Sequence, residues 1–213
     1  MSTETGFASA NPAVEEPSGK SSCHTGMNLR FELNNDLRSM SLLITQLIDP
    51  LEQMQLFLKV EQDRIQIALQ EALTNAVLHG NLEMDSELRQ EDEQVYTQLA
   101  AVRQMIWPYC DRRVHVTATF TSDRVKYIIR DEGPGFDPNS VQDPTTVGNV
   151  GRVGGRGLML IRSFVDDVSF NAQGSEITLV KYTSRENTMP AQTAQPDDLV
   201  VSADVLLFEF DEP

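Results

Sequence analysis

The sequence predicts an α/β fold in which a largely antiparallel sheet is covered on one face by helices. The first observation is the order of the periodic segments, which runs strand, helix, helix, hairpin, loop, helix, hairpin. The second is that the strand–helix–strand rhythm of a doubly wound parallel sheet is missing. The third is size, because 213 residues with 40% hydrophobic and 23% charged side chains suit one domain with a sizeable core, with or without extensions.

The composition is acidic, with a net charge of −15 from 32 acidic and 17 basic residues. Such a chain repels phosphate backbones and anionic headgroups, so direct nucleic-acid or membrane binding is disfavoured, whereas a nucleotide needs only a local positive site and a metal ion. Cys23 and Cys110 lack the spacing of a disulfide framework or a metal site. Residues 1–26 have the composition of a disordered tail and no apolar signal-peptide core. No apolar run approaches the ~20 residues that span a bilayer, and we expect a cytoplasmic protein.

The N-terminal part of the domain begins with one strand and one helix. Residues 27–33 alternate loosely between apolar and polar side chains, which predicts the first strand. Asn35 or Asp36 would cap the helix expected over about 36–58, where apolar residues recur at helical spacing. Pro50 is expected to kink or split this helix.

A second helix is expected over about 60–79, with Gly80 and Asn81 as its C-cap. Residues 82–112 read as an insertion that begins with an acidic run. Apolar residues then recur at helical spacing, which indicates a short amphipathic helix, although a solvated connector is the alternative. These apolar residues are Val95, Leu99, Val102 and Ile106.

The C-terminal half combines two hairpins, a long loop and a short helix. Turn residues between apolar runs predict the hairpins, and a loop as long as 131–157 without periodicity is usually functional or mobile. Residues 184–198 are a polar linker, and residues 199–210 are an apolar extension that would form an edge strand or bind a partner. The expected elements are strands over 113–120 and 124–130, a helix over 158–164, and strands over 168–170 and 176–182.

The helix over 60–79 carries Glu71, Asn75 and His79, which recur every four residues and therefore stack on one polar face. Glu71 is a candidate general base, although a single glutamate is more often a solvated helix residue. The amide oxygen of Asn75 is a candidate Mg²⁺ ligand, since hard cations take oxygen ligands; the alternative is a local backbone hydrogen bond. His79 would either bind near phosphates or cap the carbonyls at the helix end.

Two glycine motifs follow this helix. In Asp131-Glu-Gly133-Pro-Gly135-Phe136, Asp131 ends a strand and could accept a hydrogen bond from an exocyclic amine such as that of adenine. Gly133 and Gly135 would let the backbone approach a flat base, and the alternative is an ordinary turn.

The second motif, Gly154-Gly155-Arg156-Gly157, precedes a helix whose N–H groups could cradle a phosphate, with Arg152 or Arg156 adding charge; the alternative is a flexible linker. No Gly-Lys-Ser/Thr sequence is present, which excludes a P-loop NTPase. The three motifs together place a metal ligand, a base reader and a phosphate cradle on separate elements.

In residues 27–183 the chain resembles the GHKL superfamily, which includes the gyrase, histidine-kinase and MutL-like ATP-binding proteins. The segment from Glu71 to Asn81 is similar to the N box of that superfamily, and Asp131–Phe136 to its G1 box. Gly155-Arg156-Gly157-Leu158 is similar to the G2 box, and residues 174–178, ending in Thr178, resemble the last box, whose hydroxyl residue supports the adenine pocket. The resemblance implies a Bergerat-type two-layer sandwich, a mixed and mostly antiparallel sheet with helices on one face.

Within this superfamily the chain is most similar to the anti-sigma factor serine/threonine kinases, whose N box reads Glu-Ala-x-x-Asn-Ala-x-x-His. The resemblance implies that ATP binds with Mg²⁺ held through Asn75, that Asp131 reads adenine and that Glu71 activates the incoming hydroxyl. The implied partners are an anti-anti-sigma (STAS-type) protein and a sigma factor. A homodimer stays an alternative.

Two other function classes were weighed against this kinase. One is a non-catalytic module that uses ATP to set its affinity for a partner, for which the acidic insertion and the apolar extension would be the interaction surfaces. The other is a sensor histidine kinase fragment, which requires a phosphoacceptor histidine on a helix before the N box. Only His24 precedes that box, in a segment without helical character.

Overall fold

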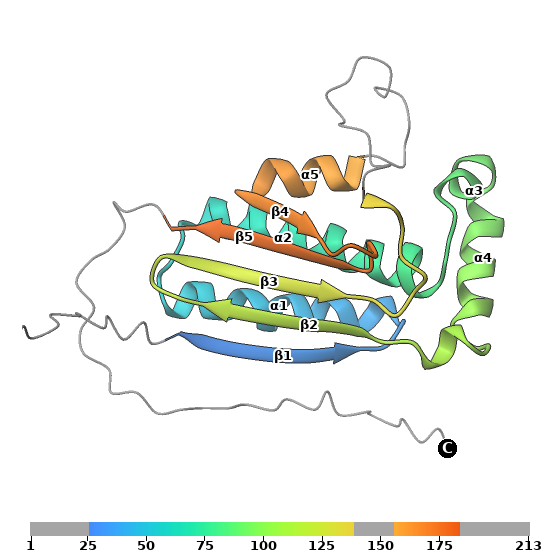
Figure 1. Cartoon of the computed structure of the whole chain (residues 1–213), viewed down its shortest axis with the longest axis horizontal. Coiled ribbons are helices and arrows are strands. Elements are labelled where there is room, and N and C mark those ends of the chain that lie inside the picture. The colour runs from blue at the N-terminus through green and yellow to red at the C-terminus, as the bar shows by residue number, and fades with distance from the viewer. Residues whose placement is uncertain (1–25, 139–155, 184–213) are drawn as a thin grey trace, which may run out of the picture.

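The structure is a computed structural model that describes residues 26–138 and 156–183, and this part of the chain forms a five-stranded sheet backed by helices (Figure 1). The strand order is β1-β2-β3-β5-β4, and each pair of neighbours is antiparallel. The predicted two-layer α/β fold is confirmed, with an antiparallel rather than a mixed sheet in the described residues. The strands are β1 (Met27–Leu33), β2 (Val114–Phe120), β3 (Arg124–Arg130), β4 (Asp167–Phe170) and β5 (Glu176–Tyr182).

Several predicted features lie outside the described residues. They are the N-terminal tail, apart from residue 26, most of the glycine-rich loop with Arg152 and Gly155, and the linker and extension over 184–213. None of the helices within residues 26–138 and 156–183 combines the length and apolarity needed to cross a bilayer.

One face of the sheet is buried because alternate residues of each central strand point toward the helices. Val125, Tyr127 and Ile129 of β3 are almost completely buried. Their register with β2 places Val116 opposite Ile129 and Phe120 opposite Val125, so apolar side chains pair on the inner face. Asp131 directly follows β3, and the same alternation directs its side chain toward the helices.

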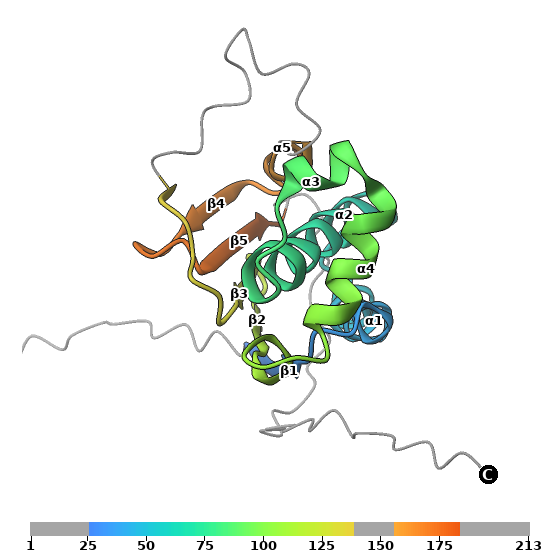
Figure 2. The ribbon, with the colours of Figure 1, turned by 90° about the vertical axis from the view of Figure 1, so that its right-hand side faces the viewer.

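Three helices cover this face, namely α1 (Leu37–Gln53), α2 (Lys59–Asn75) and α5 (Arg156–Phe164), as Figure 2 shows from the end of the sheet. Asp36 caps α1, since its carboxylate accepts a hydrogen bond of 2.9 Å from the Arg38 N–H group. The helix continues past Pro50 to Gln53 and is not split there.

The second helix does not continue as an α-helix to residue 79. It gives way after Asn75 to a π-helical turn, η1 (Ala76–Asn81), in which the Leu82 N–H group donates to the carbonyl of Val77 at 2.9 Å. The predicted C-cap at Gly80 and Asn81 is therefore wrong, because both residues lie inside η1. The polar stripe is correspondingly broken after Asn75.

The insertion forms two helices, α3 (Ser86–Glu91) and α4 (Glu93–Arg103), and a short 3-10 turn, η2 (Tyr109–Asp111), at one end of the sheet (Figures 1 and 2). Tyr96 and Ala100 are the buried residues of α4. Val95 and Val102, in the apolar stripe seen in the sequence, are 46% and 48% exposed. Leu99 of the same stripe packs against the core, so the stripe lies at the edge of the buried side of α4.

Candidate functional site

Glu71 and Asn75 lie on the side of α2 that meets the first turn of α5. A Cβ atom placed on Gly157 would lie 2.7 Å from Glu71 Oε2 and 3.8 Å from Asn75 Oδ1. A side chain at position 157 would therefore displace the Glu71 carboxylate. The structure thus brings together three of the predicted site residues, which come from the N-box helix and from the second glycine motif.

The first turn of an α-helix has backbone N–H groups without partners in the helix, and these groups attract anions. In this protein the first turn of α5 lies beside a carboxylate and an amide, both of which are partly buried. An amide oxygen next to an anion-binding turn suits a Mg²⁺ ion that carries phosphate oxygens as further ligands. The donor set therefore fits a polyphosphate with its metal, and Glu71 would lie beside the phosphate groups.

Asp131 continues the inward side of β3, and its carboxyl group lies against η1. A Cβ atom on Gly80 would lie 2.6 Å from Asp131 Oδ1, so glycine at position 80 makes room for this carboxyl group. The Gly133 N–H group donates to the same oxygen at 2.9 Å. The second oxygen, Oδ2, is then the candidate acceptor for an N–H group of a ligand.

Burial raises the pKa of Asp131 to about 6, although the hydrogen bond from Gly133 and the positive charge of Arg112 act in the opposite direction. A carboxylate that is held ionised in a partly dry position binds a hydrogen-bond donor more strongly than one in water. The position of Asp131 therefore suits recognition of an amine on a flat ring.

Gly135 packs closely against another part of the chain, and the expected approach to a base stays a prediction. Its φ angle is +73°, and a Cβ atom there would overlap the carbonyl group of Gln173 in the β4–β5 turn. A Cβ atom on Gly133 would similarly overlap the Gly80 carbonyl group. In this structure the two glycines allow the chain to approach its own backbone, and that packing fixes the turn after Asp131.

His79, Leu158 and Arg156 were also predicted to belong to the site. His79 is exposed, and its Nδ1 atom lies 2.6 Å from the carbonyl oxygen of Met84, which lies beyond the end of η1. The Leu158 side chain packs against the hydrophobic core. Arg156 is described only as the first residue of α5.

Thr178 lies on the outer face of the sheet, opposite the side of β5 that buries Ile177 and Leu179. The hydroxyl-bearing residue bonded to Asp131 through its backbone is Ser175, whose carbonyl accepts a hydrogen bond of 3.0 Å from the Asp131 N–H group and whose Oγ atom accepts one of 3.2 Å from Asn171 Nδ2. The sequence carried a signal for this residue, because Ser175 directly follows Gly174. The register of β5 against β3, which brings Ser175 to Asp131, is seen only in the structure.

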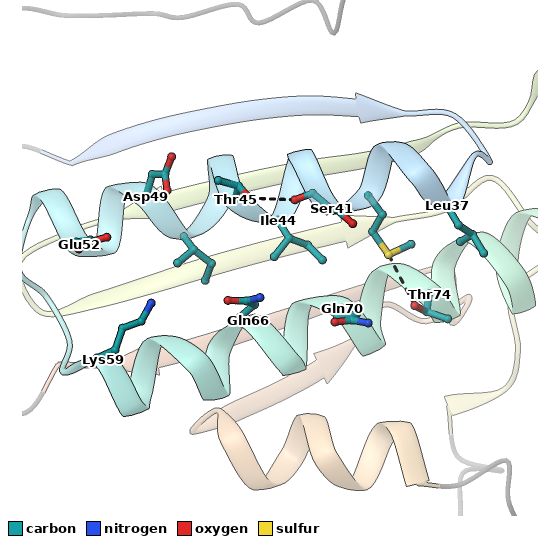
Figure 3. A pocket seen from close by; sticks show the side chains of 12 residues that line it. Leu37, Ser41, Ile44, Thr45, Asp49, Glu52, Lys59, Gln66, Gln70 and Thr74 are labelled. Carbon is teal, nitrogen blue, oxygen red and sulfur yellow. Dashed lines mark hydrogen bonds between the residues drawn. The ribbon is translucent and has the colours of Figure 1, made fainter.

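A groove of about 520 Å³ lies between α1 and α2, on another side of α2 (Figure 3). Gln66, Gln70 and Thr74 line it from α2, and Asp49 and Glu52 line it from α1. The residues on this side of α2 face α1, whereas Glu71 and Asn75 face α5. The groove and the cluster around Gly157 are therefore separate features.

Comparison with known proteins gives matches that include the polar stripe and both glycine motifs. Residues 33–181 match the family model described as a histidine kinase-like ATPase domain. The anti-sigma F factor of Bacillus velezensis is 27% identical over an alignment 135 residues long, and the match covers 61% of this chain and 75% of that protein. These matches confirm the resemblance drawn from the motifs.

Proposed function

The chain belongs to the histidine kinase-like ATPase domain family, and from this premise we propose that it is an ATP-dependent serine/threonine protein kinase that acts as an anti-sigma regulatory factor. The observation that carries the proposal is the position of Glu71 and Asn75 beside Gly157 at the start of α5, where an added Cβ atom would lie 2.7 Å from Glu71 Oε2. It joins a candidate base, a candidate metal ligand and an anion-binding turn in one place.

The residues around α2, α5 and the end of β3 have separate proposed roles in binding ATP. The amide oxygen of Asn75 would hold Mg²⁺, and the N–H groups of the first turn of α5, which have no partner within the helix, would bind the phosphates. Asp131 accepts a hydrogen bond from the exocyclic amine of adenine, and Ser175 lines the base site beside it. Bound ATP supplies the phosphoryl group, and Mg²⁺ neutralises the charge that develops on its oxygens.

Glu71 is the proposed catalytic base. Its Oε2 atom accepts the proton of the attacking serine or threonine hydroxyl as the hydroxyl oxygen bonds to the γ-phosphorus. The bond to the β–γ bridging oxygen breaks, and ADP leaves with the electron pair. Because phosphoryl transfer depends mostly on positioning and charge neutralisation, the short approach between Glu71 and the first turn of α5 is the feature that matters most.

The proposed phosphate acceptor is a small anti-anti-sigma protein of the STAS type, and the proposed second partner is a sigma factor. The name of the similar protein from Bacillus velezensis, anti-sigma F factor, supports this assignment. The acidic surface of the chain, with its net charge of −15, is also in keeping with protein rather than nucleic-acid partners.

Phosphotransfer tests the proposal directly. The full chain is incubated with ATP labelled in the γ-phosphate and with each STAS-type protein of the same genome, and the labelled residue is then mapped. Glu71→Gln should slow transfer by about 100-fold or more while ATP affinity stays within about threefold. Glu52→Gln, an exposed exchange on α1, is the matched control.

Each outcome of this experiment has a distinct meaning. Equal transfer rates for wild type and Glu71→Gln would show that Glu71 is not the base. ATP binding without transfer to any STAS-type protein would favour the non-catalytic, ATP-gated module. Absence of ATP binding would contradict both functions.

A further inference from the structure

Asn81, at the end of η1, is a completely buried amide whose hydrogen bonds lead to the turn after Asp131. Its Oδ1 atom accepts from the backbone N–H group of Glu132 at 2.8 Å. That N–H group belongs to the peptide unit that joins Asp131 to Glu132. Since a peptide unit is planar, holding its N–H group fixes the direction in which β3 ends and thus the position of the Asp131 carboxyl group.

The other end of the Asn81 side chain is held by a second buried amide. Asn81 Nδ2 donates to Asn35 Oδ1 at 2.8 Å, and Asn35 is itself only 4% exposed. The two amides lie 46 positions apart in the sequence, and each orients the other. Buried polar groups that are fully satisfied in this way specify one local arrangement, because any other arrangement leaves a group unpaired.

The insertion supplies the remaining partners of Asn35. The Asn35 Nδ2 atom donates to the backbone carbonyl groups of Tyr109 and Arg112 at 2.7 Å and 3.3 Å. The backbone carbonyl of Asn35 accepts from Gln104 Nε2 at 2.8 Å. Arg112 also donates to the carbonyl of Asn81 at 2.7 Å. The segment that fits the family pattern least well is therefore connected by hydrogen bonds to the turn that carries Asp131.

We propose that Asn81, anchored through Asn35 to the insertion of residues 82–112, is a positioning residue that sets the selectivity of the site for a base with an exocyclic amine. Asn81 does not touch the nucleotide; it acts through Asp131. This inference rests on the proposed function, because it requires that Asp131 read the base.

A comparison of ATP with inosine triphosphate, which carries a carbonyl group in place of the adenine amine, tests this role. Binding of each nucleotide with Mg²⁺ to the full chain is measured by calorimetry. Wild type should prefer ATP by about tenfold or more, which is the effect of one hydrogen bond to a charged acceptor. Asn81→Leu should weaken ATP by about tenfold and leave inosine triphosphate within about twofold, so the preference disappears.

The ratio of the affinities for ATP and inosine triphosphate separates a positioning role from a general loss of structure, because partial unfolding would weaken the binding of both nucleotides equally. If Asn81→Leu does not fold, Gln104→Met decides the question. It removes only the bond from the end of α4 to Asn35 and should lower the preference by about two- to threefold. Gln98→Met, an exposed exchange on the same helix, is the control and should change neither affinity.

The outcomes distinguish this inference from the proposed function. If the wild type prefers ATP and both Asn81→Leu and Gln104→Met keep that preference, the positioning role is overturned. The proposed function is then left intact. A wild type that binds neither nucleotide, or both equally, would overturn the reading of adenine by Asp131 and this inference with it.

Discussion

Replacement of Asp131 by asparagine should stabilise the protein at neutral pH while it impairs nucleotide binding. The exchange is nearly isosteric, and an amide oxygen still accepts the hydrogen bond from Gly133. It removes a carboxylate that burial holds at a pKa of about 6. The folded protein at pH 7.5 must keep this group ionised, which costs free energy that the unfolded chain does not spend.

The magnitude follows from the pKa. The difference between about 6 in the folded state and the ordinary 3.8 corresponds to about 3 kcal/mol. Contact with solvent screens this partly buried group and reduces the expected gain to about 1–2 kcal/mol. Because the folded pKa is raised, protonation favours the folded state. The cost is thus absent below pH 3.8 and complete above pH 6.

Urea unfolding of the wild type and the variant at pH 7.5 and pH 4 measures this effect. Asp131→Asn should be more stable by about 1–2 kcal/mol at pH 7.5, and the difference should fall to about 0.5 kcal/mol or less at pH 4. Asp49→Asn, an exposed exchange on α1, controls for the change in net charge. Equal differences at both pH values, or a less stable variant at pH 7.5, would refute the assignment of a buried, ionised carboxylate.

Three further predictions concern the same site and its support. ATP affinity should fall as the pH drops below about 6, because protonation of Asp131 removes the charged acceptor; calorimetry at pH 7.5 and 5.5 measures this, and equal affinities would contradict it. Gly157→Ala should slow phosphotransfer by about tenfold or more, since the added Cβ lies 2.7 Å from Glu71 Oε2; an unchanged rate would show that this approach is not needed. Tyr127→Phe should cost about 1 kcal/mol in urea unfolding, because it removes the buried hydrogen bond to the Leu47 carbonyl, and a loss of ATP affinity in this variant would be unexpected.

The sheet and its helices could be predicted from the sequence because their periodicity directly reflects burial. The strand over 27–33 has the predicted bounds, and the cap at Asp36 follows from the chemistry of its short acidic side chain. The cluster of Glu71, Asn75 and Gly157 depends only on α2 and α5 lying side by side. The sequence placed these motifs on separate elements, and the packing of α2 against α5 brings them together.

The π-helical turn could not be predicted, because one extra residue in a helical turn leaves the apolar pattern almost unchanged. The contacts of this turn are long-range, since Gly80 makes room for the Asp131 carboxyl group and Asn81 accepts a hydrogen bond from Glu132. Ser175 was missed for a related reason. Strand register, rather than residue type, decides which hydroxyl-bearing residue bonds to the backbone of Asp131, and register depends on the pairing of β3 with β5.

The buried side of α4 could not be predicted from the sequence either. Val95 and Val102 have the spacing of a core stripe, yet Tyr96 and Ala100 are the residues of α4 that are buried, and Leu99 is the member of the stripe that packs against the core. A helix with apolar residues over a wide arc can bury either flank, and the choice is made by the surface that it meets. For α4 that surface is set by long-range contacts, such as the hydrogen bond from Gln104 to Asn35.

The most direct test of the proposed function is a crystal structure of the full chain with Mg²⁺ and a non-hydrolysable ATP analogue. The predicted result places the adenine amine on the Asp131 carboxylate, the metal ion on the amide oxygen of Asn75, and the γ-phosphate between Glu71 and the first turn of α5. A nucleotide bound elsewhere, or one whose base does not contact Asp131, would contradict the proposed function.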